Sequence, residues 1–125
     1  MSIDEPTGEV LRPFRVKRDE AEHFERAGFE GFIQVPVEQG LGFSALTIWA
    51  NGEHPRKRMV EGTRIYYVAE GVGSFTLGDE DFAVTEGDLF VVPEGGEYSY
   101  QGSMALFEVN IPSPAGAIVD LKLDS

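Results

Sequence analysis

Short apolar segments separated by glycine and proline turns run through the chain from about residue 31 to residue 112, and they limit the folds available to it. Segments such as FSALTIWA, TRIYYVAEG, DLFVVP and MALFEVNIP are rich in β-branched and aromatic residues. Tight turns such as Gly78-Asp79 and Glu86-Gly87 separate them, and Pro93 stands where a strand can end without losing a ladder hydrogen bond. Because this spacing is typical of sandwiches and barrels, we predict an all-β fold.

Glycine and proline also recur at fixed distances in two stretches, NGEHPRKRMVEGTRIYYVAEG (residues 51–71) and GDLFVVPEGGEYSYQG (residues 87–102). Together these stretches resemble the two motifs of the cupin family, G-x5-H-x-H-x3-E-x6-G and G-x5-P-x-G-x2-H-x3-N. The motif backbone is matched without a gap by Gly52, Gly71, Gly87, Pro93 and Gly95. This resemblance implies a jelly roll, the double-stranded β-helix barrel of the cupins.

In cupins the remaining motif positions supply metal ligands, and this chain replaces all four of them. The two histidine positions hold Arg58 and Val60, the glutamate position holds Arg64, and the last histidine position holds Tyr98. Valine has no lone pair to donate, and a protonated guanidinium repels a divalent cation. We therefore expect neither a metal nor another cofactor.

Strand alternation predicts which side chains share the barrel interior. If the former glutamate position faces inward, Arg64 and Tyr66 lie on one face, and Tyr98 and Tyr100 share a face by the same rule. Glu108 lines the cavity or faces outward. The candidate ligand-binding residues are thus Arg58, Arg64, Tyr66, Tyr98, Tyr100 and Glu108. Their arginines either hold a carboxylate or phosphate of a ligand, or form internal ion pairs, for example with Glu108 or Glu61.

Three functions are compatible with such an interior. The first is a metal-independent cupin that binds a small carboxylate, phosphate or sugar-like molecule. The second is a metal-independent isomerase, epimerase or cyclase acting on a sugar or keto acid, with Tyr98, Tyr66 or His54 moving the proton. The third is a non-catalytic structural or assembly subunit. No histidine or carboxylate stands at a former ligand position to act as base, which favours binding. His54 and His23 are otherwise expected on the surface.

The segments that flank the barrel complete a single domain over residues 1–125, with an N-terminal arm (1–30), a barrel core (31–112) and a C-terminal arm (113–125). Asp19 followed by Glu22 is typical of a helix start and Gly28 of a helix stop, so a short helix is expected near residues 20–27. Residues 11–18 alternate like an edge strand, as does the sequence after Pro114. An arm beside an open-edged barrel predicts a homodimer.

Composition narrows the partners further. The chain has 125 residues and a formal net charge of −12, which disfavours binding to nucleic acid and to anionic membrane surfaces. No apolar run approaches the roughly 18 residues of a membrane span, and no secretory signal is recognised. The absence of cysteine excludes disulfides and thiolate chemistry. These observations predict a cytoplasmic protein.

Overall fold

The computed structural model of the protein describes residues 12–112 and the backbone of residues 118–120. Its strands are β1 (Glu22–Arg26), β2 (Phe29–Val35), β3 (Ser44–Met59), β4 (Thr63–Leu77), β5 (Glu80–Ala83), β6 (Leu89–Val92), β7 (Glu97–Ile111) and β8 (Ile118–Asp120). Two 3₁₀ turns, η1 (Arg18–Glu20) and η2 (Val37–Gln39), precede β1 and β3. The predicted all-β jelly roll is confirmed.

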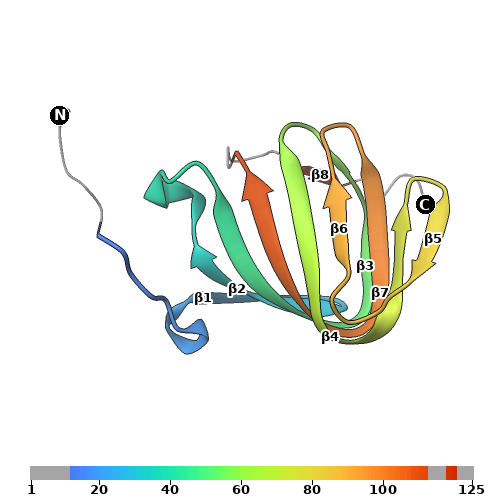
Figure 1. Ribbon diagram of the computed structural model, residues 1–125, viewed down its shortest axis with the longest axis horizontal. Coiled ribbons are helices and arrows are strands. Elements are labelled where there is room, and N and C mark those ends of the chain that lie inside the picture. Colours follow the sequence, from blue (N-terminus) through green and yellow to red (C-terminus); the bar gives the residue numbers. More distant parts are fainter. Residues whose placement is uncertain (1–11, 113–117, 121–125) are drawn as a thin grey trace.

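Three long strands, β3, β4 and β7, each run through both walls of the barrel. The order in the sheet is β1-β2-β3-β7-β4-β5, all antiparallel, with β6 beside β4 and β8 beside β3. The first half of β4 pairs with β6 and its second half with β5, while β3 pairs first with β2 and then with β8. Figure 1 shows how the long strands curve so that the sheet folds back on itself.

A row of glycines lies where the long strands bend. Gly102 of β7 is paired with Gly52 of β3 on one side and with Gly73 of β4 on the other. Gly52 and Gly102 have φ angles of 134° and 140°, a conformation that residues with a side chain rarely adopt. A Cβ atom on Gly102 would also lie 2.5 Å from the Cα of Gly73. The row therefore requires glycine, and it lets three strands turn the corner together.

Apolar and aromatic side chains fill the space between the two walls. Val68 and Phe75 of β4 are completely buried, and Leu106 of β7 is 1% exposed. Phe75 stacks on Phe90 of β6, with ring centroids 4.2 Å apart and planes 10° apart. This core occupies the closed side of the barrel, near the glycine row, whereas polar residues lie toward the open side.

The prediction of a helix near residues 20–27 is wrong. Only the turn η1 is helical, and residues 22–26 form β1, which pairs with β2. Gly28, interpreted as the end of a helix, instead lies in the two-residue turn between these strands with φ of 91°. Its carbonyl accepts a hydrogen bond from the Asn51 amide at 2.8 Å. Pairing with β2 thus outweighs a weak local helix signal.

The expectations for the two arms have different outcomes. Residues 12–17 form no strand, and residue 11 lies outside the described part. After Pro114 the backbone of residues 118–120 forms β8, which pairs with β3 at Lys57 to Met59. Within the described ranges there is no helix long and apolar enough to cross a membrane.

Candidate functional site

A buried ion pair stands at the centre of the polar side of the barrel. Arg64 of β4 and Glu108 of β7 face each other with Nη2 and Oε2 3.2 Å apart, and their side chains are 14% and 7% exposed. Nη1 of Arg64 donates to the Tyr98 hydroxyl at 2.7 Å, which bridges the two walls of the barrel. Burial opposes the charge on Arg64, but attraction to Glu108 and to the tyrosine oxygens outweighs it, so the net pKa of Arg64 is raised.

Asn110 and Ser44 extend this network along β7 and β3. Asn110 Oδ1 accepts from Arg64 Nε at 2.6 Å. Its Nδ2 atom donates to Glu108 Oε2 at 3.0 Å and to Ser44 Oγ at 3.1 Å. Because both Asn110 and Ser44 are buried, these bonds satisfy groups that would otherwise lose their hydration without compensation. The network thus fixes the orientation of the ion pair.

Three tyrosines line the interior behind the ion pair. The hydroxyls of Tyr66 and Tyr98 lie 3.0 Å apart, and either can be the donor. Burial raises the pKa of Tyr66 well above the usual tyrosine value, and the Glu108 carboxylate raises it further. The pKa values of Tyr98 and Tyr100 are also raised by burial, partly offset in both by Arg64. All three phenols therefore carry their protons at neutral pH and act as hydrogen-bond donors.

His54 was expected on the surface, but the structure packs it among aromatic rings. It is 5% exposed and stacks on Tyr100 with ring centroids 4.5 Å apart and on Tyr98 at 5.3 Å. Phe29 covers another side at 4.9 Å. Among the residues described, the Tyr100 hydroxyl has no hydrogen-bond partner. Ring stacking therefore holds the imidazole inside the barrel, next to a buried phenol.

A cavity of about 360 Å³ opens at the polar side of the barrel, and we call it the mouth cavity. The buried network supplies its polar lining through Ser44, Arg64, Glu108 and Asn110. Apolar side chains and two glutamates complete it: Glu22, Ile33, Pro36, Val37, Glu38 and Leu46. An apolar wall around a few fixed polar groups is typical of small-molecule sites.

A larger hollow, of about 580 Å³, has the buried His54 and Tyr100 in its lining but none of the residues of the ion-pair network. The rest of its lining includes Ser74, Thr76, Ser99 and Gln101. By strand alternation these polar side chains face outward. The mouth cavity is therefore the one that reaches the buried ion pair.

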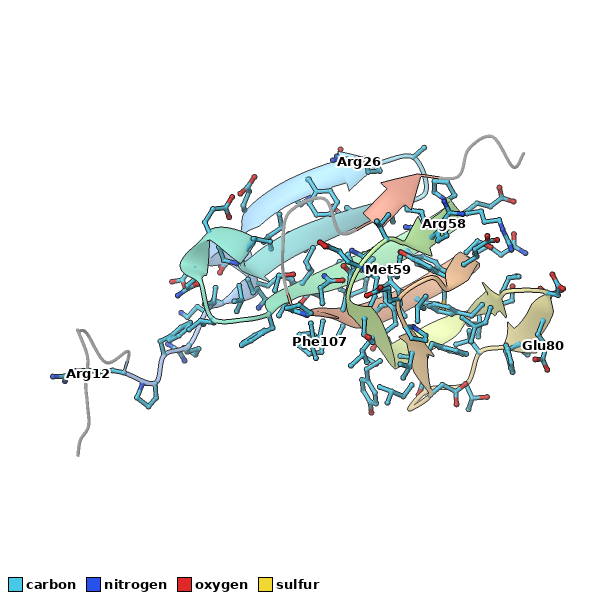
Figure 2. All side chains as sticks on the ribbon, turned by 90° about the horizontal axis from the view of Figure 1, so that it is seen from above. Arg12, Arg26, Arg58, Met59, Glu80 and Phe107 are labelled. Atoms are coloured by element: carbon cyan, nitrogen blue, oxygen red, sulfur yellow. The ribbon has the colours of Figure 1, made fainter. Side chains whose placement is uncertain are left out.

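The structure brings five of the six predicted ligand-binding residues to the interior and leaves out Arg58. The side chain of Arg58 is 47% exposed and its Nη1 atom lies 4.0 Å from Glu97 Oε2. A β-bulge between His54 and Lys57 shifts the alternation, so that Met59 is buried in the core while Arg58 points away from it (Figure 2). The prediction for Arg58 rested on its former metal-ligand position in the cupin motif, and the bulge moves that position out of the interior.

The motif positions that hold metal in cupins do not fit a metal here. Arg58 and Val60 are exposed, at 47% of the side chain and 49% of the residue, and the bulge turns the first of them away from the interior. Arg64 and Tyr98 do face inward, but they are hydrogen-bonded to each other. Neither a guanidinium nor a protonated phenol is a ligand for a divalent cation.

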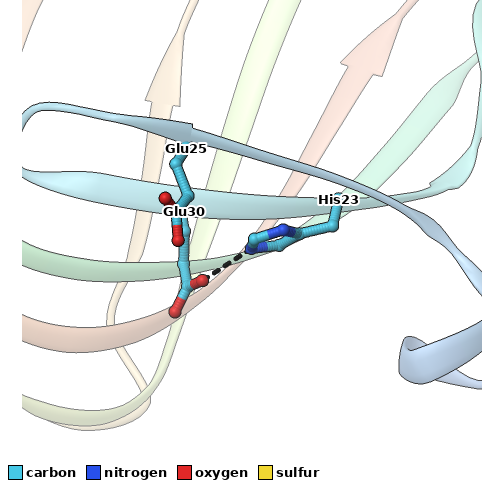
Figure 3. Close-up of side chains that lie close together, drawn as sticks. All are labelled: His23, Glu25 and Glu30. Carbon is cyan, nitrogen blue, oxygen red and sulfur yellow. Dashed lines mark hydrogen bonds and ion pairs between the residues drawn. The ribbon is translucent and has the colours of Figure 1, made fainter.

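One exposed group of potential metal ligands lies on the β1–β2 hairpin. His23, Glu25 and Glu30 place their ligand atoms within 4.8 Å of one another (Figure 3). His23 Nε2 lies 2.6 Å from Glu30 Oε1. The His23 side chain is 41% exposed and the Glu30 side chain 39%. Glu25 and Glu30 are directly opposite each other on the paired strands. None of these three residues lines the mouth cavity.

Two residues of the network, Asn110 and Ser44, were not among the predicted site residues. Asn110 carried a signal, because Glu108 and Asn110 are polar residues on the alternate positions of an otherwise apolar strand, MALFEVNIP. Ser44 carried none, since a single serine at the start of a strand is common. Its place in the site depends on the pairing of β3 with β7, where Ser44 is opposite Asn110.

The fold and part of the sequence match known proteins. The Cupin domain family matches residues 45–104. Streptomyces Pac13, a nucleoside dehydratase also solved with uridine, aligns with a TM-score of 0.78 and 20% identity, over 88% of this chain and 92% of Pac13. Ectoine synthase from P. lautus aligns with a TM-score of 0.73 and 14% identity, over 87% of this chain and 90% of the synthase. KdgF from Halomonas sp. aligns with a TM-score of 0.71 and 15% identity, over 83% of this chain and 97% of KdgF. No match was found among curated proteins.

These likenesses agree with the motif spacing seen in the sequence. The glycines of both motifs lie at the turns and bends that the barrel needs, and the matched region contains most of β3, all of β4 to β6 and the first half of β7. The chain has the jelly-roll fold of its structural neighbours across nearly all of its described length. Residues 45–104 thus match the Cupin domain family, and the chain has the cupin fold.

Proposed function

We propose that this protein binds a small polar organic molecule in the mouth cavity without the help of a metal. The observation that carries the proposal is a buried, hydrogen-bonded polar network, Arg64 with Glu108 and Asn110, that lines a cavity of about 360 Å³. A barrel that only needed a packed core would be expected to fill this space with apolar side chains, because buried charges are costly. Pac13, a neighbour of the same fold, is solved with uridine, a molecule of suitable size.

The binding proposal is tested by looking for the molecule directly. Native mass spectrometry of the purified protein should show a co-purified compound, and a metabolite library screened by NMR should give binders. The variant Val37→Trp would fill the mouth cavity, whereas Val72→Trp changes a residue that is 70% exposed near the bend of the barrel. We expect the first to abolish binding and the second to preserve it. Equal binding by both variants would refute the mouth cavity as the site.

Metal independence has its own test. If the motif positions cannot hold a divalent cation, the protein purified without chelator should contain far less than one iron, manganese, nickel or zinc per chain. Elemental analysis measures this directly. A stoichiometric metal that survives dialysis against chelator would contradict the proposal, and substitution of His23 would then show whether the exposed cluster on β1 and β2 holds it.

Acid–base catalysis is a second candidate, favoured by the phenols that burial keeps protonated. Tyr66 and Tyr98 are hydrogen-bonded to each other behind Arg64, so a proton can pass between the two phenols. A nucleoside dehydratase, a reaction class that needs proton transfer, is among the proteins of similar fold. Turnover of nucleosides, sugars or keto acids, assayed by mass spectrometry and lost in Tyr98→Phe, would support it. Binding without turnover would leave the protein as a binding cupin.

We further propose that the protein is a homodimer, formed through one outer face of the barrel. Leu89, Tyr67 and Phe107 lie in register on β6, β4 and β7 and are 58%, 44% and 44% exposed. Val91 continues this apolar face at 47% exposure. The face carries no charge, whereas the chain has a net charge of −12, so it is where two copies can approach with least repulsion. The occupant is therefore a second copy of this chain.

A further inference from the structure

The residues that line the mouth cavity carry more negative than positive charges. Glu22, Glu38 and Glu108 contribute three carboxylates to the lining, and the one cation among the lining residues is Arg64. Glu22 and Glu38 are exposed at the rim, while Glu108 is buried at the base. An anion entering this cavity approaches two glutamates before it reaches any positive charge. The surrounding field, from a chain with net charge −12, adds to that repulsion.

The single cation is already committed to internal partners. Arg64 uses Nε for Asn110, Nη1 for Tyr98 and Nη2 for Glu108. A carboxylate or phosphate would have to displace Glu108 from the guanidinium, and it would leave that buried carboxylate unpaired. The arginine pattern predicted from sequence as an anion receptor is therefore neutralised in the folded protein. Its two remaining N–H groups can still donate to a neutral oxygen.

The same residues offer good partners to an uncharged ligand. Both contacts of the Glu108 carboxylate within the described chain use Oε2, which leaves Oε1 to accept a hydrogen bond. Ser44 Oγ accepts from Asn110, so its own hydrogen can be donated. Ile33, Val37 and Leu46 provide apolar surface for a ring or a carbon chain. The cavity thus offers a ligand both hydrogen-bond donors and hydrogen-bond acceptors next to apolar surface.

From these contacts we infer that the mouth cavity selects uncharged or cationic molecules that carry hydroxyl, amide or ammonium donors, and that it rejects anions. This inference rests on the proposed binding function and narrows its ligand class. Molecules that carry such donors beside an apolar part match the lining, because its polar groups lie next to Ile33, Val37 and Leu46. A carboxylate or a phosphate ester of the same molecule matches it worst, because no unpaired cation compensates its charge.

Matched pairs of probes test this selection. Uridine with uridine 5′-monophosphate and glucosamine with glucosamine 6-phosphate each differ by one phosphate. The binder found in the library screen and its carboxylate or phosphate derivative form a third pair. Titration calorimetry or NMR at low ionic strength should show the phosphate-free member binding at least ten-fold more tightly. The difference should shrink as salt is added, because the exposed rim glutamates are screened.

Rim variants make the test independent of the buried network. Replacing Glu22 and Glu38 by glutamine removes two exposed charges without touching the core. In this double variant, the ratio between the affinities of the neutral and the anionic probe of a pair should be several-fold smaller than in the native protein. The matched control replaces Glu70 and Glu80, which are also exposed but do not line the cavity, and it should leave the difference nearly unchanged.

The possible results separate the two claims. Anionic members that bind as tightly as their neutral partners, or more tightly, would overturn the inference while leaving the binding function standing. A rim variant that behaves like its control would overturn the electrostatic explanation. If neither the probes nor any library compound binds, the proposed function fails and the inference falls with it.

Discussion

Arg64 and Glu108 neutralise each other at 3.2 Å inside the barrel, on neighbouring strands that carry them to the base of the mouth cavity. Of the two roles that the sequence left open for Arg64, an anion receptor or an internal ion-pair partner, the structure displays the second. The pair also explains why the cavity remains polar, since Asn110 and Tyr98 are oriented by the same guanidinium.

Replacing Arg64 by methionine should be strongly destabilising. The substitution keeps a long apolar stem but leaves the Glu108 carboxylate buried without its cation, which costs about 3–5 kcal/mol of unfolding free energy. Chemical denaturation followed by circular dichroism measures the loss.

The control is the same substitution at Arg58, whose side chain is 47% exposed and lies 4.0 Å from Glu97 at its nearest approach. Arg58→Met should change the unfolding free energy by no more than about 0.5 kcal/mol. Equal effects at the two positions would show that the buried ion pair is not a major contributor to stability.

Replacing Glu108 by glutamine should create an anion site where the native protein has none. The amide keeps the shape of the side chain but leaves the Arg64 charge without its counter-ion. Added phosphate should then raise the melting temperature of Glu108→Gln by mass action, and it should have a much smaller effect on the native protein. A melting temperature of the variant that is indifferent to phosphate would mean that the cavity cannot admit an anion to Arg64.

The protein should lose stability as the solution becomes alkaline. The pKa values of Tyr66, Tyr98 and Tyr100 are raised in the folded state, mainly by burial. A raised pKa in the folded protein contributes stability that is fully present below the unfolded value of about 10 and is lost as the pH rises above it. Unfolding free energies measured from neutral pH to beyond pH 10 should therefore fall at the alkaline end.

Tyr100→Phe provides the matched variant for that measurement. The Tyr100 hydroxyl is buried and has no partner among the described residues, so its removal should leave stability at neutral pH the same or slightly higher. The variant should also lose less stability at high pH than the native protein. A large destabilisation of Tyr100→Phe at neutral pH would reveal a hydrogen bond that this account lacks.

Placing a charge on the uncharged outer face should dissociate the dimer. Phe107 points away from the barrel interior in Figure 2 and pairs with Tyr67 on the next strand. Phe107→Lys should therefore be monomeric in sedimentation or light scattering at micromolar concentration, while Val72→Lys, near the bend, should remain dimeric. A native protein that is monomeric would refute this interface, and so would a Phe107→Lys variant that stays dimeric.

Much of the fold could be predicted from the sequence because the turns carry strict backbone requirements. Gly52, Gly71 and Gly87 all adopt positive φ angles, so their spacing reports the geometry of the barrel whether or not a metal is present. The N-terminal segment was mispredicted as a helix for the opposite reason. Gly28 fits either a helix end or a hairpin turn, and only the partner strand β2 decides between them.

The site could be predicted only as far as regular alternation holds. Arg64, Tyr66, Tyr98 and Tyr100 lie inside, as alternation predicted, because β4 and β7 alternate without interruption at these residues. Glu108, whose direction the sequence left open, is buried on the same side. Arg58 follows a bulge whose position has no clear mark in the sequence, and one extra residue reverses the face of everything after it. The burial of His54 likewise depends on Phe29, which arrives from the misassigned hairpin.

The glycine corner described above also constrains how this site can change. Since β7 passes the corner once, Tyr98 stands in one wall and Glu108 in the other, joined by a single uninterrupted strand. An insertion or deletion of a single residue between them would turn one of the two to the other face of the strand and separate Tyr98 from the ion pair. The chemistry of the cavity can therefore be altered by substitution, but changes in chain length are tolerated only in the turns that connect the strands.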